Sequence, residues 1–123
     1  LQKASEAKKA EDNRPIRQAK QYIEENYSRS LTLEEVSEMA GFAPGYFSTL
    51  FKKETGESFS RYLTQVRMEK AKELLCSTNM KVAQISERVG FANVSYFCRS
   101  FREYYGSSPE SYRKGTGEDE QTS

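Results

Sequence analysis

The sequence contains no histidine in its 123 residues, and several other signs of catalysis are also missing. It has no Cys-x-x-Cys pair, no glycine-rich phosphate loop and no pair of carboxylates in an obvious cleft arrangement. These patterns are the usual sequence signs of metal sites, cofactor sites and acid–base chemistry. We therefore predict that the chain is not an enzyme and binds no metal or cofactor.

Long hydrophobic runs are absent as well. No apolar stretch approaches the roughly 18 residues that a membrane span needs, and the charged, alanine-rich start lacks the apolar core of a signal peptide. These absences predict a cytoplasmic protein. Its two cysteines, Cys76 and Cys98, are then expected to be reduced thiols rather than a disulfide.

The sequence has almost no excess of basic charge, because it contains 19 basic and 18 acidic residues. The two ends dilute it: residues 1–13 and 115–123 hold three lysines and six acidic residues. Residues 14–114 therefore keep 16 basic and 12 acidic residues, an excess of four positive charges. This mild excess does not by itself establish a nucleic-acid partner.

What the sequence does contain is helical periodicity, which predicts an all-α fold of seven helices. The chain length suits one compact domain, or two very small ones that share a helix. We expect a charged linker or frayed helix over 1–13, a domain over 14–114 and a disordered acidic tail over 115–123. Because Leu1 is not an initiator methionine, we also expect the chain to be part of a longer protein. The expected helices span 15–27 with Pro15 in the first turn, 33–40 after a Thr32–Glu35 capping box, 44–54, 58–76, 82–89, 94–105 and a short seventh from Ser108-Pro109 through Tyr112.

An internal repeat is the most informative feature. Residues 33–42 and 82–91 share one pattern of apolar residues, which then ends at Gly41 or Gly90. Glycine in these places favours the left-handed backbone that ends a helix, and Phe42 and Phe91 then pack back on the helix. The shared apolar positions are Leu33, Val36 and Ala40 in the first copy and Val82, Ile85 and Val89 in the second.

After each turn a second helix is predicted, and its matching segments in the two copies are residues 46–52 and 96–102. The helix in the first copy is expected to end at Gly56 and the helix in the second copy at Gly106. Ser58 and Ser108 then follow as the expected N-caps of the next helices. Phenylalanines spaced for one buried face are expected in the core, and the small or polar residues between them point outward. These phenylalanines are Phe42, Phe47, Phe51, Phe91, Phe97 and Phe101.

Two short helices joined by a glycine turn describe a helix-turn-helix unit. The units, about 14–57 and 77–114, are joined by a linker helix of about 28 Å, from a rise of 1.5 Å per residue. Successive major-groove faces of B-DNA lie roughly 34 Å apart, so one chain could read two adjacent turns of the groove. The alternative is a helical protein-interaction module without DNA binding, which would need an exposed apolar stripe that the repeat leaves unused.

Residues 14–114 resemble the AraC/XylS family of bacterial transcription regulators. The most specific match runs from Arg67-Met68-Glu69-Lys70-Ala71 to Gly106-Ser107-Ser108-Pro109, with Phe51-Lys52-Lys53-Glu54-Thr55-Gly56 as the matching run of the first unit. The resemblance implies seven helices, of which the third and sixth enter the major groove of double-stranded DNA and the fourth joins the units. RNA polymerase is a further partner that the resemblance suggests, and dimerisation, if any, would use a missing upstream domain. The sequence also resembles response regulators in which a receiver domain precedes the DNA-binding domain. The resemblance does not distinguish an activator of transcription from a repressor.

The resemblance also assigns residues to the DNA surface. Arg99 can offer a bidentate guanidinium to guanine, Val94 can touch a thymine methyl group, and Gly45 has no side chain, so the first unit is expected to position more than it reads. The alternative for Cys98, which cysteine more often favours, is a small buried side chain. The base-reading residues are Gly45, Ser48, Thr49, Val94, Ser95, Cys98 and Arg99. The phosphate-contacting residues are Tyr46, Lys52, Lys53, Tyr96 and Arg102, although a surface lysine often contacts only water.

Overall fold

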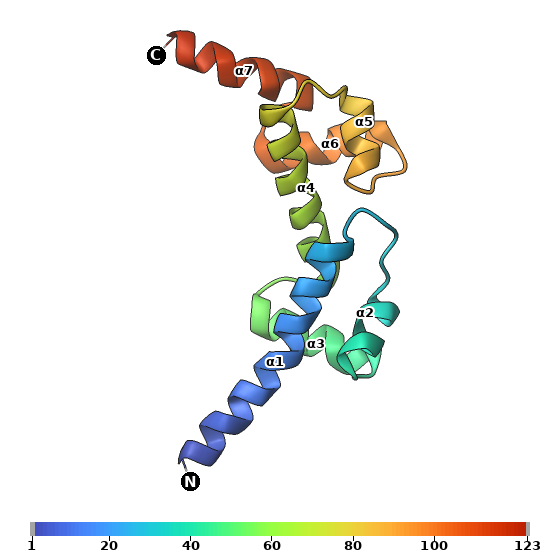
Figure 1. Ribbon diagram of the computed structural model, residues 1–123, viewed down its shortest axis with the longest axis vertical. Helices are drawn as coiled ribbons and strands as arrows, with labels where there is room; N and C mark the ends of the chain where they lie inside the picture. The colour runs from blue at the N-terminus through green and yellow to red at the C-terminus, as the bar shows by residue number, and fades with distance from the viewer. Residues whose placement is uncertain (1, 123) are drawn as a thin grey trace. The chain divides into compact units, whose positions relative to one another are not determined.

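The computed structural model describes the backbone of residues 2–122 and the side chains of residues 14–115. Within this range all regular structure is helical, which confirms the predicted all-α fold of seven helices (Figure 1). The chain divides into two compact units, residues 1–64 and 65–123. The helices are α1 (Gln2–Asn26), α2 (Leu33–Ala40), α3 (Pro44–Thr55), α4 (Phe59–Ser77), α5 (Val82–Arg88), α6 (Val94–Tyr105) and α7 (Pro109–Thr122).

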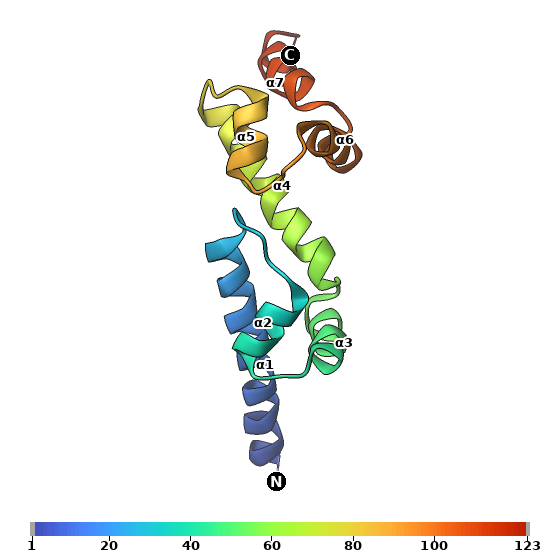
Figure 2. The same ribbon diagram turned by 90° about the vertical axis from the view of Figure 1, so that its right-hand side faces the viewer.

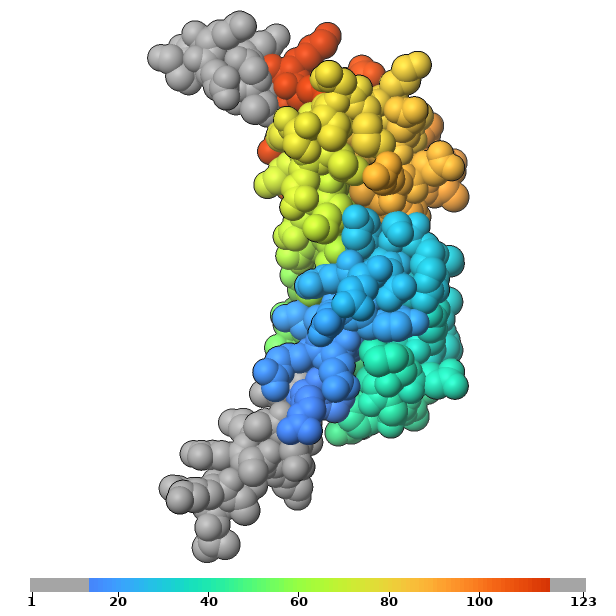
Figure 3. All heavy atoms as spheres, in the orientation of Figure 1, coloured from blue at the N-terminus to red at the C-terminus, as the bar shows by residue number. Residues whose placement is uncertain are grey.

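In the first unit, α1 packs against both α2 and α3 (Figure 2). The core is built from side chains that recur three and four residues apart on each helix, as one buried helical face requires. Figure 3 shows the side chains of residues 14–26 of α1 and of the loop before α2 packed into a continuous surface on its visible face. The buried core of this unit includes Ile16, Ala19 and Ile23 of α1, Val36 of α2 and Phe47 and Phe51 of α3.

The second unit repeats this core. Ile85 and Val89 follow the helix pattern of the first unit's α2, and Phe97 and Phe101 are buried as their counterparts on α3 are. The repeat also reaches the preceding helix, which sequence comparison missed. Buried Met68, Ala71 and Leu75 of α4 stand 52 positions after Ile16, Ala19 and Ile23 of α1.

The two turns have the backbone that the glycines predict. Gly41 has a φ of 85° and Gly90 a φ of 101°, both in the left-handed region. The next residue closes the turn in each copy: the N–H of Phe42 donates to the Ser37 carbonyl, and the N–H of Phe91 donates to the Ser86 carbonyl, each at 2.9 Å. This pairing satisfies helix-end carbonyls that would otherwise lack a partner.

The other predicted caps are present too. Ser58 Oγ accepts from the N–H of Arg61 at 3.3 Å, and Ser108 Oγ accepts from the N–H of Ser111 at 3.2 Å. In the second unit, the Arg113 guanidinium of α7 donates to the Leu75 carbonyl at 3.0 Å and to the Thr78 carbonyl at 3.2 Å. Arg113 thereby ties α7 to the carboxyl end of α4.

Three sequence expectations need correction. Pro15 lies inside α1 instead of opening it, because the Ala, Lys and Glu residues before it are strong helix formers. Helix α7 continues past Tyr112 to Thr122. Phe42 is half-buried rather than in the core, and its ring lies at the turn, edge-on against the exposed ring of Tyr46. The expected linker over 1–13 and the expected tail over 115–123, except for Gly115, lie outside the residues whose side chains are described.

Candidate nucleic-acid interface

Helix α3 separates its apolar residues from its outward ones. Pro44 occupies the first turn, where a missing N–H costs no hydrogen bond, and no side chain caps the helix at Ala43. Phe47 and Phe51 point into the core. The predicted contact residues of this helix lie on its other faces: Gly45, Tyr46, Thr49, Lys52 and Lys53 are exposed, and Ser48 is half-buried.

Two contacts define the chemistry of the outward face of α3. Thr49 Oγ1 donates a hydrogen bond to the Gly45 carbonyl at 3.2 Å. The Tyr46 ring packs edge-on against Phe42, with ring centroids 5.1 Å apart. Nothing lies within 4 Å of the place where a Cβ on Gly45 would be, so the backbone is open to close approach there.

Helix α6 begins with a firmer cap. Asn93 Oδ1 accepts from the N–H of Tyr96 at 3.0 Å, which satisfies one of the free donors of the first turn. Phe97 and Phe101 point into the core of the second unit. The predicted contact residues again lie on the remaining faces: Val94, Ser95, Tyr96, Arg99 and Arg102 are exposed, and Cys98 is half-buried.

Two side chains give α6 its distinct chemistry. The Arg99 guanidinium carbon lies 5.9 Å from the centroid of the Tyr96 ring, within cation–π range. Burial, followed by the nearby charge of Glu110, raises the pKa of the Cys98 thiol. Cys98 therefore offers a neutral thiol at neutral pH.

The large exposed apolar side chains gather at the starts of these two helices. Among the described residues, five such side chains are more than a third exposed, and three of them, Tyr46, Val94 and Tyr96, lie in the first turn of α3 or α6. The structure thus brings the predicted contact residues together within each unit, on one helix per unit.

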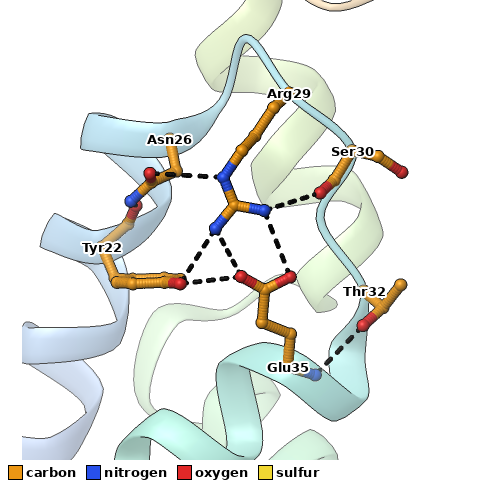
Figure 4. Close-up of polar contacts among 6 residues, drawn as sticks. All are labelled: Tyr22, Asn26, Arg29, Ser30, Thr32 and Glu35. Carbon is orange, nitrogen blue, oxygen red and sulfur yellow. Dashed lines mark hydrogen bonds and ion pairs between the residues drawn. The ribbon is translucent and has the colours of Figure 1, made fainter.

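A polar cluster that the sequence did not predict supports α2, the helix before α3 (Figure 4). The Tyr22 hydroxyl donates to Glu35 Oε2 at 2.7 Å and accepts from Arg29 Nη2 at 2.9 Å. Arg29 also forms an ion pair with Glu35. The hydrogen bond from Arg29, and then the one from Tyr22, lower the pKa of the Glu35 carboxyl.

This cluster corrects half of the predicted capping box. Thr32 Oγ1 does accept from the N–H of Glu35, at 3.0 Å. The Glu35 carboxylate, however, turns toward Arg29 and Tyr22 (Figure 4). The cluster therefore ties the first turn of α2 to the end of α1 and to the loop between them.

No described group of three or more Cys, Asp or Glu side chains is arranged to hold a metal ion. Over the same described residues, no helix has the length and hydropathy to cross a membrane.

Comparison with known proteins decides the family. A helix-turn-helix domain model matches residues 36–115, from within α2 through the first part of α7. The chain belongs to the AraC-type helix-turn-helix family of transcription regulators. This membership confirms the resemblance noted in the sequence, and it also confirms that the domain is not an enzyme.

Individual members of the AraC-type family are similar over most of the chain. The regulatory protein PocR of Salmonella typhimurium is 39% identical over 103 residues, which are 84% of this chain and 34% of that protein. The C-terminal domain of AraT, a response regulator from Geobacillus stearothermophilus, is 44% identical with a TM-score of 0.80, covering 83% of this chain and 85% of that one. The DNA-binding domain of AdpA, solved with a target DNA, is 25% identical with a TM-score of 0.79, covering 82% and 91%. The chain spans about a third of the length of PocR.

Proposed function

We propose that this AraC-type domain binds promoter or operator DNA with α3 and α6 as its recognition helices, placed in two successive turns of the major groove. The observation that carries the proposal is the repeated unit: a glycine turn followed by a helix with phenylalanines inward and small, polar or basic residues outward. The relative AdpA, whose DNA-binding domain is similar in structure, was solved on a target DNA.

The two recognition helices have unequal chemistry. Arg99 on α6 can pair with O6 and N7 of guanine, which is the most discriminating contact available to these side chains, and Val94 can touch a thymine methyl group. Ser95 and Cys98 complete this base-reading set. On α3, Gly45, Ser48 and Thr49 offer shorter or no side chains. We infer that α6 carries most of the base reading and that α3 mainly positions the domain.

Phosphate contacts are assigned to the residues that flank the base readers. Lys52 and Lys53 on α3 and Arg102 on α6 are exposed cations, which suit the charge of the backbone. The hydroxyls of Tyr46 and Tyr96 can donate to phosphate oxygens. These contacts would fix the register of the domain without selecting a sequence.

The chain corresponds to only a part of its relatives, so the whole protein is a further proposal. The similarity to the C-terminal domain of the response regulator AraT favours a regulator with a receiver upstream. Dimerisation would then depend on that upstream domain, RNA polymerase would be a second partner, and the regulator would act in the cytoplasm.

The proposal is tested by titrating the domain against a random duplex and a duplex selected from a random pool, at several salt concentrations. Affinity should fall steeply as salt rises, with a slope of about one per phosphate contact. Lys52→Ala should weaken all sequences alike and reduce that slope by about one, whereas Arg99→Ala should relax the preference at one base pair, at a cost of about 1–3 kcal/mol. Affinity that is independent of salt would exclude the proposal.

A further inference from the structure

A row of four side chains in the second unit leads from α4 to the outward face of α6. The Arg67 guanidinium carbon lies 5.6 Å from the centroid of the Phe91 ring. The Phe91 ring centroid lies 5.9 Å from that of Tyr96, and Arg99 lies over the Tyr96 ring at the same separation of 5.9 Å. We call Arg67, Phe91, Tyr96 and Arg99 the aromatic column.

The column is fixed at its inner end and open at its outer end. Phe91 is 8% exposed, and its ring also contacts the buried ring of Phe97 at 5.3 Å between centroids. Tyr96 is 54% exposed, and its backbone N–H is held by Asn93. The Tyr96 ring is therefore supported from below while one part of its surface remains available to Arg99.

Helix geometry places Arg99 on this ring. Residues three apart on a helix are surface neighbours, so Tyr96 and Arg99 adjoin on α6. An arginine side chain has many rotamers, and a free one must lose most of them when it pairs with a base. A guanidinium that already rests on a ring loses less conformational freedom when it binds, which favours its contact with the matching base.

The first unit provides a natural contrast. Tyr46 and Phe42 stand where Tyr96 and Phe91 stand in the second unit, and their rings are also in contact, at 5.1 Å. The position of Arg99, however, is taken by Thr49, whose hydroxyl is bonded to Gly45. The first unit thus has the tyrosine without the arginine that it would hold.

We propose that Tyr96 is a positioning residue for base reading, whose ring holds the Arg99 guanidinium toward the base edge. The proposal rests on the proposed function of α6. It assigns to the ring a role distinct from the phosphate contact of the hydroxyl, so the two parts of the side chain can be tested separately.

The test compares Tyr96→Leu, which removes the ring, with Tyr96→Phe, which removes only the hydroxyl. The readout is the ratio of affinities for a selected duplex and for the same duplex changed at the base pair that Arg99→Ala relaxes. Tyr96→Leu should reduce this ratio by about two- to fivefold, the range for an exposed cation–π contact. Tyr96→Phe should keep the ratio, and Tyr96→Leu should add no further loss in the Arg99→Ala background.

The matched control is Tyr46→Leu, which removes the equivalent ring of the first unit and should leave the ratio unchanged. Equal losses for Tyr96→Phe and Tyr96→Leu, or a Tyr96→Leu effect that is the same on all sequences, would overturn the positioning role. Thermal unfolding of each variant shows that the comparison is made between folded proteins.

A second measurement needs no DNA. The mobility of the Arg99 side chain, measured by ¹⁵Nε relaxation in the free domain, should rise in Tyr96→Leu and stay unchanged in Tyr96→Phe. Unchanged mobility of the Arg99 side chain in both variants would show that the Tyr96 ring does not hold it. If the wild-type domain shows no sequence preference, the proposed function of α6 fails, and the relaxation measurement still decides whether Tyr96 holds Arg99.

Discussion

Thr49 and Arg99 show how much a single equivalent position can differ between the two units. Both are exposed on the outward face of a proposed recognition helix, α3 or α6, 50 positions apart in the sequence. Thr49 bonds back to its own helix, whereas Arg99 lies over the ring of Tyr96. The inferred division between a positioning helix and a reading helix depends largely on this one difference.

The Glu35 cluster leads to a prediction about pH. Because the pKa of Glu35 is lowered in the folded protein, the cluster stabilises the fold above the unfolded pKa of about 4.3. That stabilisation is lost as the pH falls through the lowered, folded pKa. Glu35→Gln should therefore reduce stability at pH 7, and the difference from wild type should shrink below about pH 4. Urea unfolding across this pH range measures it.

Glu34→Gln is the matched control for this prediction. Glu34 and Glu35 both lie in the first turn of α2, so their interactions with the helix dipole are similar. Glu34 is exposed, and Glu35 has the contacts to Arg29 and Tyr22. Equal losses of stability in the two variants would assign the effect to the helix terminus instead of the cluster.

Sequence reasoning succeeded for side chains that a helical period can sort. Phe47, Phe51, Phe97 and Phe101 were predicted to point inward from their spacing, and all four are buried. The Tyr22–Glu35 contact could not be predicted in this way, because it joins two helices across 13 residues of sequence. Its position depends on how α1 and α2 pack, which no local pattern contains.

At the scale of elements, the glycine turns were predictable because their backbone has a strong residue preference. The helix bounds were less predictable. Pro15 was expected to begin a helix, yet α1 continues on both sides of it. A proline marks where a backbone hydrogen bond is missing. Whether a helix starts or continues there depends on the neighbouring residues.

A pair of glycines on either side of the first turn tests this reasoning. Gly41→Ala should destabilise the domain by about 1–2 kcal/mol, because a Cβ disfavours the left-handed backbone. Gly45→Ala should stabilise it by about 0.5–1 kcal/mol, because Gly45 lies within α3 and alanine restricts the unfolded chain. The free energies come from urea unfolding.

These two sites are well matched, because neither added Cβ would have an atom within 4 Å. Only Gly41 of the pair has a positive φ, 85°. The same sign of change at both positions would show that backbone conformation is not what distinguishes them. A loss of DNA affinity in Gly45→Ala without a loss of stability would support close backbone approach at α3.

At the scale of the whole molecule, the repeat was visible in the sequence only in part. The two turns share glycine and phenylalanine, so residues 33–42 and 82–91 align by inspection. Helices α1 and α4 share a buried face on which Ala19 and Ala71 match, whereas Ile16 is replaced by Met68 and Ile23 by Leu75. Because two of the three residue types differ, this part of the repeat becomes evident only when the buried cores are compared.

The duplicated architecture predicts the form of the DNA site. Selection from a random pool should return two blocks of preferred sequence about 10 base pairs apart, the repeat of the major groove. One block should be better defined and should lose its preference in Arg99→Ala, whereas replacing both Ser48 and Thr49 by alanine should have a smaller effect. Blocks of equal definition that respond equally to both variants would contradict the division between reader and anchor.

The hydrogen bond from Thr49 to Gly45 predicts which bases the first unit prefers in the less well-defined block of the DNA site. With its hydrogen directed at the Gly45 carbonyl, the threonine oxygen faces outward with its lone pairs and acts as an acceptor. In the major groove the complementary donors are the exocyclic amino groups of adenine and cytosine. The preference of the first unit, though small, should therefore lean toward these two bases and away from the keto groups of guanine and thymine.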